Sequence, residues 1–125
     1  MLIASGKFQG CNGYKVSGAF SFDLRDEVLW FQTTEDFFFE GAPAPGFAIS
    51  NGGASPAAEA KMNDFLRLPG TSDPFRKQLE VRGVFRAPLR HTLGLKDALA
   101  VFLWCYDFPG VLGVGEIIHR RSLVA

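Results

Sequence analysis

The segment from Ala98 to Tyr106 constrains the fold of this chain more than any other. Its nine residues carry no charge, and the side chains on both alternating faces are apolar or aromatic. A strand that is apolar on both faces is covered on both sides in a folded sheet. The β-branched and aromatic residues, and the Asp-Phe-Pro-Gly turn at 107–110, favour a strand over a helix. We therefore predict a central strand of a packed sheet.

A second apolar run, Val111–Ile118, follows that turn and carries Gly113 and Gly115 at alternating positions. The two glycines leave one face of this predicted strand without side chains. Glycine within a strand is typical of a β-bulge, or of a place where another group approaches the backbone closely. We expect one of these features beside the central strand.

The rest of the chain reads as short strands separated by turns. Alternation of apolar and polar residues is clearest over Tyr14–Phe22, which predicts a half-buried strand with one wet face. Only Ser55–Met62 has the capping residue and the composition of a helix. Further strands are expected at Leu2–Gln9, Val28–Thr34, Phe47–Ser50, Phe65–Leu68 and Lys77–Ala87.

This pattern predicts an all-β domain. The expected architecture is an antiparallel β-sandwich or flattened β-barrel of about seven to nine short strands, with at most one short helix. No internal repeat or linker divides residues 1–125, so we expect a single domain. The region that includes Arg82 and Arg86 has a basic bias, which is typical of an edge strand whose charges block edge-to-edge association.

Composition and charge limit the classes of partner. Hydrophobic residues make up 47% of the chain, so disorder is excluded. The 13 basic and 13 acidic residues cancel, which argues against nucleic-acid binding because that function usually needs a basic excess. No stretch approaches the ~20 apolar residues of a membrane-spanning helix. Residues 1–7 lack the features of a signal peptide, which predicts a cytoplasmic protein, or else a mature chain or an excised domain.

Three segments, in this order, carry the pattern of a known domain family. The first is Gly6-x-Phe8 followed by the Val-Ser-Gly of residues 16–18. The second is Asp36-Phe37 with the Pro-Ala-Pro of residues 43–45 behind it. The third is the Val-Phe-Leu-Trp-Cys-Tyr-Asp-Phe run of residues 101–108 with the glycine-rich strand after it. Together they resemble the DM-thirteen domain family of Skeletor-type proteins, which is often found beside DOMON domains.

The resemblance implies a function and an environment. Members of this family are usually extracellular or periplasmic. The family's cysteine, carried here by Cys105, has been proposed to act in redox chemistry or to ligate a prosthetic group such as haem. Asp36 occupies the place of the family's acidic residue. The resemblance therefore implies a non-enzymatic redox or cofactor-binding module with an electron-transfer role.

The residues around Cys105 allow two interpretations. As a redox thiol or soft ligand, Cys105 would line a pocket, and its reactivity would depend on nearby positive charge and water. As a structural residue, it would be a small buried hydrophobe, the commoner state of a free cysteine. The first interpretation assigns the pocket to a set of neighbours that includes both strand glycines: Trp104, Tyr106, Asp107, Phe108, Gly113 and Gly115.

Other candidate groups are sparse. Cys11 lies in a glycine-flanked turn and is expected to be exposed, and a disulfide between Cys11 and Cys105 is an open alternative. His91 and His119 belong to no ligand-spaced motif, so we predict no metal site, and the attachment motif for c-type haem is missing. No acid–base or nucleophile pattern indicates an enzyme.

The alternative function is a structural or adhesion module that contacts other proteins. It predicts an exposed aromatic patch at Phe37–Phe39 beside the loop with Pro43 and Pro45. It also predicts that Cys105 is fully packed. Both functions fit the same predicted fold, so the surroundings of Cys105 discriminate between them.

Overall fold

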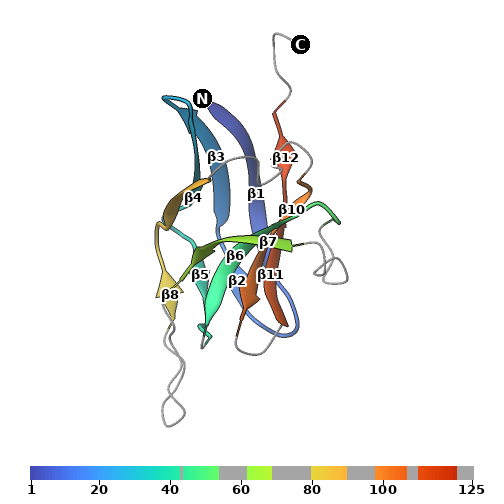
Figure 1. Ribbon diagram of the computed structural model, residues 1–125. Helices are drawn as coiled ribbons and strands as arrows, with labels where there is room; N and C mark the ends of the chain where they lie inside the picture. Colours follow the sequence, from blue (N-terminus) through green and yellow to red (C-terminus); the bar gives the residue numbers. More distant parts are fainter. Residues whose placement is uncertain (43, 54–61, 69–79, 90–97, 107–109, 121–125) are drawn as a thin grey trace.

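Figure 1 shows a computed structural model of the chain, and the structure describes residues 1–42, 44–53, 62–68, 80–89, 98–106 and 110–120. Regular structure in these residues is entirely β, in agreement with the predicted all-β class. The helix predicted at Ser55–Met62 lies outside the described residues except for Met62, which begins a strand. The described residues form twelve strands: β1 (Leu2–Gly10), β2 (Val16–Ser17), β3 (Ala19–Arg25), β4 (Val28–Thr33), β5 (Phe38–Phe39), β6 (Pro45–Ser50), β7 (Met62–Arg67), β8 (Val81–Arg82), β9 (Arg86–Leu89), β10 (Ala100–Cys105), β11 (Gly110–Glu116) and β12 (Ile118–His119).

The eight strands of four or more residues form one antiparallel sheet in the order β7-β6-β10-β11-β1-β3-β4-β9. The short β12 pairs with the first half of β1. The terminal strands of this order, β7 and β9, contact each other, so the sheet curls into a nearly closed barrel. Phe65 of β7 packs against Phe31 of β4 at 4.9 Å between ring centroids, which closes the barrel from within. The predicted antiparallel all-β fold, a sandwich or a barrel, is therefore confirmed in its barrel-like form, and β9 with Arg86 is the last strand of the order, as expected of an edge strand.

A small second sheet, β2-β5-β8, lies toward the bottom of Figure 1. The strand predicted over Tyr14–Phe22 is split between β2 and β3 by Gly18, whose φ is +93°. The backbone of Phe37 lies 2.5 Å from the place a Gly18 Cβ would take, so only glycine allows this approach. The split lets Val16 pair with Phe39, while β3 continues in the barrel.

The central strand β10 lies between β6 and β11, as the sequence predicts. One face belongs to the main core, and the other packs in a smaller cluster outside the barrel wall. The inward residues are Val101, Leu103 and Cys105, and the outward cluster contains Ala100, Phe102, Val111 and Val114, with Trp104 and Cys11 partly buried against it.

Phenylalanine rings fill the barrel. Phe8 stands 5.0 Å from Phe20, 5.4 Å from Phe37 and 5.5 Å from Phe47, measured between centroids. Burying each ring stabilises the fold by roughly 1.5–3 kcal/mol, and each favourable ring pair adds about 0.5–1.5 kcal/mol. The expected exposed patch at Phe37–Phe39 is wrong, because Phe37 and Phe39 are each 1% exposed. The strand alternation turns only Phe38 outward, where the Arg82 guanidinium lies 4.9 Å from its ring centroid.

Both features expected at the glycine-rich strand are present. The register between β10 and β11 shifts between Leu103 and Trp104, which marks a bulge or irregularity there. Gly113 and Gly115 face inward, where the Val16 side chain lies 2.9 Å from a Cβ built on Gly113, and the Phe20 ring 2.5 Å from one built on Gly115. The glycine face of β11 is therefore filled by side chains from β2 and β3.

Replacing Gly115 with alanine should destabilise the fold by about 1–3 kcal/mol, because the new methyl group overlaps a ring held by its neighbours. The measurement is the urea midpoint of unfolding. Ser21→Ala, on the outer face of β3, is the matched control and should change stability by less than about 0.5 kcal/mol. A Gly115→Ala variant as stable as the wild type would show that Phe20 can move away.

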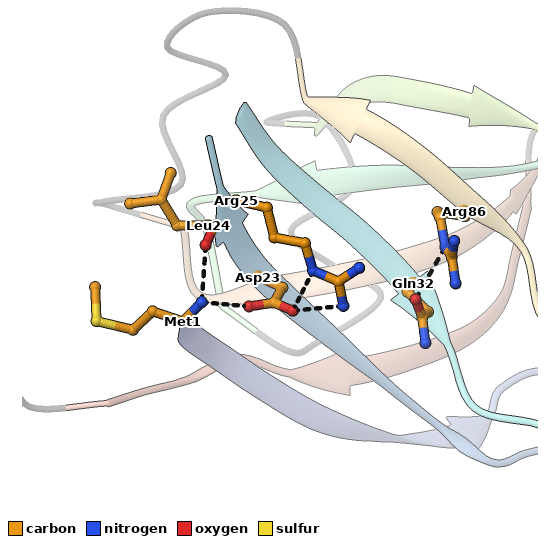
Figure 2. Close-up of polar contacts among 6 residues, drawn as sticks. All are labelled: Met1, Asp23, Leu24, Arg25, Gln32 and Arg86. Atoms are coloured by element: carbon orange, nitrogen blue, oxygen red, sulfur yellow. Dashed lines mark hydrogen bonds and ion pairs between the residues drawn. The ribbon is translucent and has the colours of Figure 1, made fainter. Parts of the chain in front are cut away.

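Polar contacts join the start of β1 to the end of β3 (Figure 2). The Met1 ammonium donates to the Leu24 carbonyl at 2.7 Å and lies 2.9 Å from the Asp23 carboxylate. Arg25 binds the other oxygen of that carboxylate through Nε at 2.9 Å and Nη2 at 2.8 Å. Hydrogen bonds from the ammonium and from Arg25 lower the pKa of Asp23 below its ordinary 3.8.

These contacts predict a pH dependence of stability. A carboxyl group whose pKa is lower in the folded state stabilises the fold above its unfolded pKa, and this stabilisation is lost as the pH falls through the folded pKa. Asp23→Asn should therefore lower the urea midpoint slightly at neutral pH. At a pH below the folded pKa of Asp23, the substitution should leave the urea midpoint unchanged. Asp26→Asn, in the adjacent exposed turn, is the control. An equal deficit of Asp23→Asn at every pH would contradict this origin.

Candidate functional site

Cys105 is the last residue of β10, and its side chain is fully buried in the main core. It shares its inward face with Val101 and Leu103, and its backbone pairs with Pro45 and Gly110. A thiol reacts as the thiolate and needs solvent and positive charge nearby. The surroundings of Cys105 instead match the interpretation as a small packed hydrophobe.

The other predicted site residues do not converge on this sulfur. Trp104 and Tyr106 flank Cys105 in the chain, are both half-buried, and Trp104 packs in the outer cluster. Asp107 and Phe108 lie outside the described residues. The inward positions of Gly113 and Gly115 are occupied by Val16 and Phe20, so side chains fill the space beside both glycines.

Asp36 lies apart from the other candidates, in the exposed turn between β4 and β5. The Thr34 hydroxyl donates a hydrogen bond to its carboxylate. The same Thr34 oxygen accepts a hydrogen bond from the Ala19 amide at 3.0 Å. Asp36 thus stabilises a turn, a common role for aspartate beside a strand end.

The two cysteines are separated by the barrel wall. Both are free, and Cys11 belongs to the outer cluster, whereas Cys105 faces the inner core. The alternative of a disulfide between them is therefore wrong. Cys11 is half-buried rather than exposed, and burial raises the pKa of its thiol.

The histidines and acidic residues supply no metal-binding cluster in the part of the chain that the structure describes. His119 is exposed, and its Nε2 lies 2.7 Å from the Ala98 carbonyl oxygen. His91 lies outside the described residues.

Tyr106 has a polar environment that the sequence did not indicate. Its hydroxyl oxygen is buried and has no hydrogen-bond partner among the residues that the structure describes, and the Arg67 guanidinium stands 3.6 Å above its ring. Gly46 makes room for the ring, since a Cβ there would lie 3.0 Å from the hydroxyl oxygen. Burial, and then the negative charge of Asp64, raise the pKa of Tyr106 to about 12, against a smaller opposite effect of Arg67. The phenol is therefore neutral at physiological pH.

Asp64→Asn should lower the pKa of Tyr106 from about 12 toward its ordinary 10.0, while burial keeps it above that value. Alkaline titration of tyrosinate absorbance measures this in a Tyr14→Phe background, where Tyr106 is the one remaining tyrosine. Glu35→Gln, an exposed turn residue, should leave the titration unchanged. An unchanged pKa in Asp64→Asn would contradict the assigned cause.

A groove of about 700 Å³ lies on the outer face of the barrel, over β1 and its neighbours β3, β11 and β12. We call it the outer groove. Its lining combines small side chains with larger apolar and charged ones. Its lining includes Leu2, Ser5, Lys7, Gln9, Ala19, Ser21, Thr34, Val114, Glu116 and Ile118, and does not include Cys105.

Sequence alternation marks most of these residues as outward-facing, but it does not reveal which strands become neighbours. The pairing of β1 with three different strands brings them together: β3 on one edge, and β11 and then β12 on the other. The signal that could have found the groove is the run of small outward residues on β1 and β3, namely Ser5, Ala19 and Ser21.

Fold and side chains together define an all-β, barrel-like domain with a packed cysteine and an outer groove. None of the described residues forms a helix with the length and apolar character needed to cross a membrane. Comparison with protein families, with curated proteins and with solved structures finds no match to this chain. Membership of the DM-thirteen family, and a redox or haem-binding role of Cys105, stay predictions from the sequence.

Proposed function

We propose that this domain is a non-enzymatic structural or adhesion module that binds a protein partner through the outer groove. The observation that carries the proposal is the place of the groove. It lies on the solvent side of β1 and collects side chains from four strands, whereas Cys105 is turned into the core. The groove has a volume of about 700 Å³.

The chemistry around Cys105 supports this choice over the redox alternative. Its side chain is 0% exposed and shares a strand face with the apolar residues Val101 and Leu103, so solvent does not reach the sulfur. A prosthetic group beside the glycines of β11 would have to displace Val16 and Phe20. Displacing packed core side chains is costly, because protein interiors have few voids.

Thiol labelling tests whether Cys105 is a packed core residue, as the proposal requires, or a reactive thiol, as the redox alternative requires. In a Cys11→Ser variant Cys105 is the one remaining thiol, and it should be unreactive toward a maleimide in the folded protein and react fully in urea. A titration of the wild type with haem should give no spectrum of ligated haem. The matched Cys105→Ala variant, with Cys11 retained, should label at one site in the folded protein.

Rapid labelling of Cys105 in the folded protein would contradict the proposal. So would a haem spectrum that the Cys105→Ala variant loses. Either result would make the sulfur the functional centre and favour the redox or cofactor-binding module.

A further inference from the structure

Resting on the proposed interaction function, we infer that the partner in the outer groove is a second copy of this chain, bound face to face about a twofold axis. In such a contact the same patch is used by both copies, so every contact between two different residues occurs twice. The patch must then be complementary to itself in shape and in charge.

The shape of the groove meets the first condition. Ile118 is 64% exposed on β12, a high value for a large apolar side chain. Its register partner is Ser5 on β1, which in turn pairs with Ser21 on β3. A protruding apolar side chain therefore stands beside the small side chains of two neighbouring strands. A twofold axis through the patch would place Ile118 of each copy over these small side chains of the other.

The charges of the groove meet the second condition. Lys7 and Glu116 are both exposed, and the pairing of Phe8 with Gly115 places them opposite each other on β1 and β11. Neither forms an ion pair with any residue that the structure describes. A twofold axis that lies in the contact and runs between β1 and β11 exchanges the two positions, so Lys7 of each copy would face Glu116 of the other.

The charge of the whole chain favours the same occupant. A protein with a large net charge repels its own copies, and that repulsion is absent here because the net charge is +0 at pH 7. Within the groove Lys7 and Glu116 also cancel, so the patch has no single sign that would select a strongly acidic or basic partner.

Charge reversal tests the inference by sedimentation equilibrium. The wild type should show a concentration-dependent monomer–dimer equilibrium. Lys7→Glu and Glu116→Lys should each raise the dimer Kd roughly tenfold or more, because like charges would meet twice in every dimer. The double variant should return Kd to within about threefold of the wild type, since the exchanged charges again face opposite ones.

Two further variants complete the design. Ile118→Ser should weaken the dimer by removing the apolar contact, without changing the charge. Lys15→Glu makes the same charge change as Lys7→Glu at an exposed position outside the groove lining, and should leave Kd unchanged. Urea midpoints of all variants establish that each one is folded.

The inference is overturned by a wild type that stays monomeric at every concentration, by single reversals that behave like Lys15→Glu, or by a double variant that is not restored. A monomeric wild type with an unreactive Cys105 would remove the second copy as partner and leave the proposed interaction function standing. If the chain forms a dimer with the expected charge dependence but Cys105 is reactive, the dimer interface stands. The proposed function, which gives Cys105 no redox or ligand-binding role, is then contradicted.

Discussion

The barrel depends on the close approach of the Phe20 ring to two glycines on neighbouring strands. Gly6 of β1 and Gly115 of β11 both lack the Cβ that would collide with this ring. The missing side chains allow the sheet to curve around Phe20, and the ring then reaches Phe8, Phe22 and Phe31. Because a sheet closes only if its inner face is both curved and filled, this contact links the local sequence to the architecture.

The same packing decides the environment of Cys105. Once the rings of the core and the apolar residues of β10 are in place, the strand alternation leaves the thiol on the filled side of the wall. The sulfur is then one more apolar group in the core. Polar side chains that can contact another molecule lie instead on the outer face of β1, which faces the solvent.

The sequence was most informative where one residue pattern has one structural solution. The two apolar faces of β10 and the apolar runs at Leu2–Gln9 and Val28–Thr34 predict strands that the structure contains. The alternating glycines of β11 predict a bulge or a close approach, and the structure contains both. The prediction of an exposed patch at Phe37–Phe39 was wrong, because a run of three similar residues does not reveal which of them faces inward. The position of the outer groove and the Arg67–Tyr106 contact did not follow from the residue pattern, since each brings together residues that are far apart in the chain and meet only through the barrel's topology.

The position of the two thiols on opposite sides of the barrel wall has a consequence for how the domain responds to its surroundings. An oxidant cannot cross-link the chain internally without first opening it, so the folded state gains nothing from an oxidising compartment and loses nothing in a reducing one. Resistance to unfolding must therefore come from non-covalent contacts, chiefly the packed aromatic interior. Covalent linkage to a neighbouring molecule would have to use Cys11, the half-buried member of the pair.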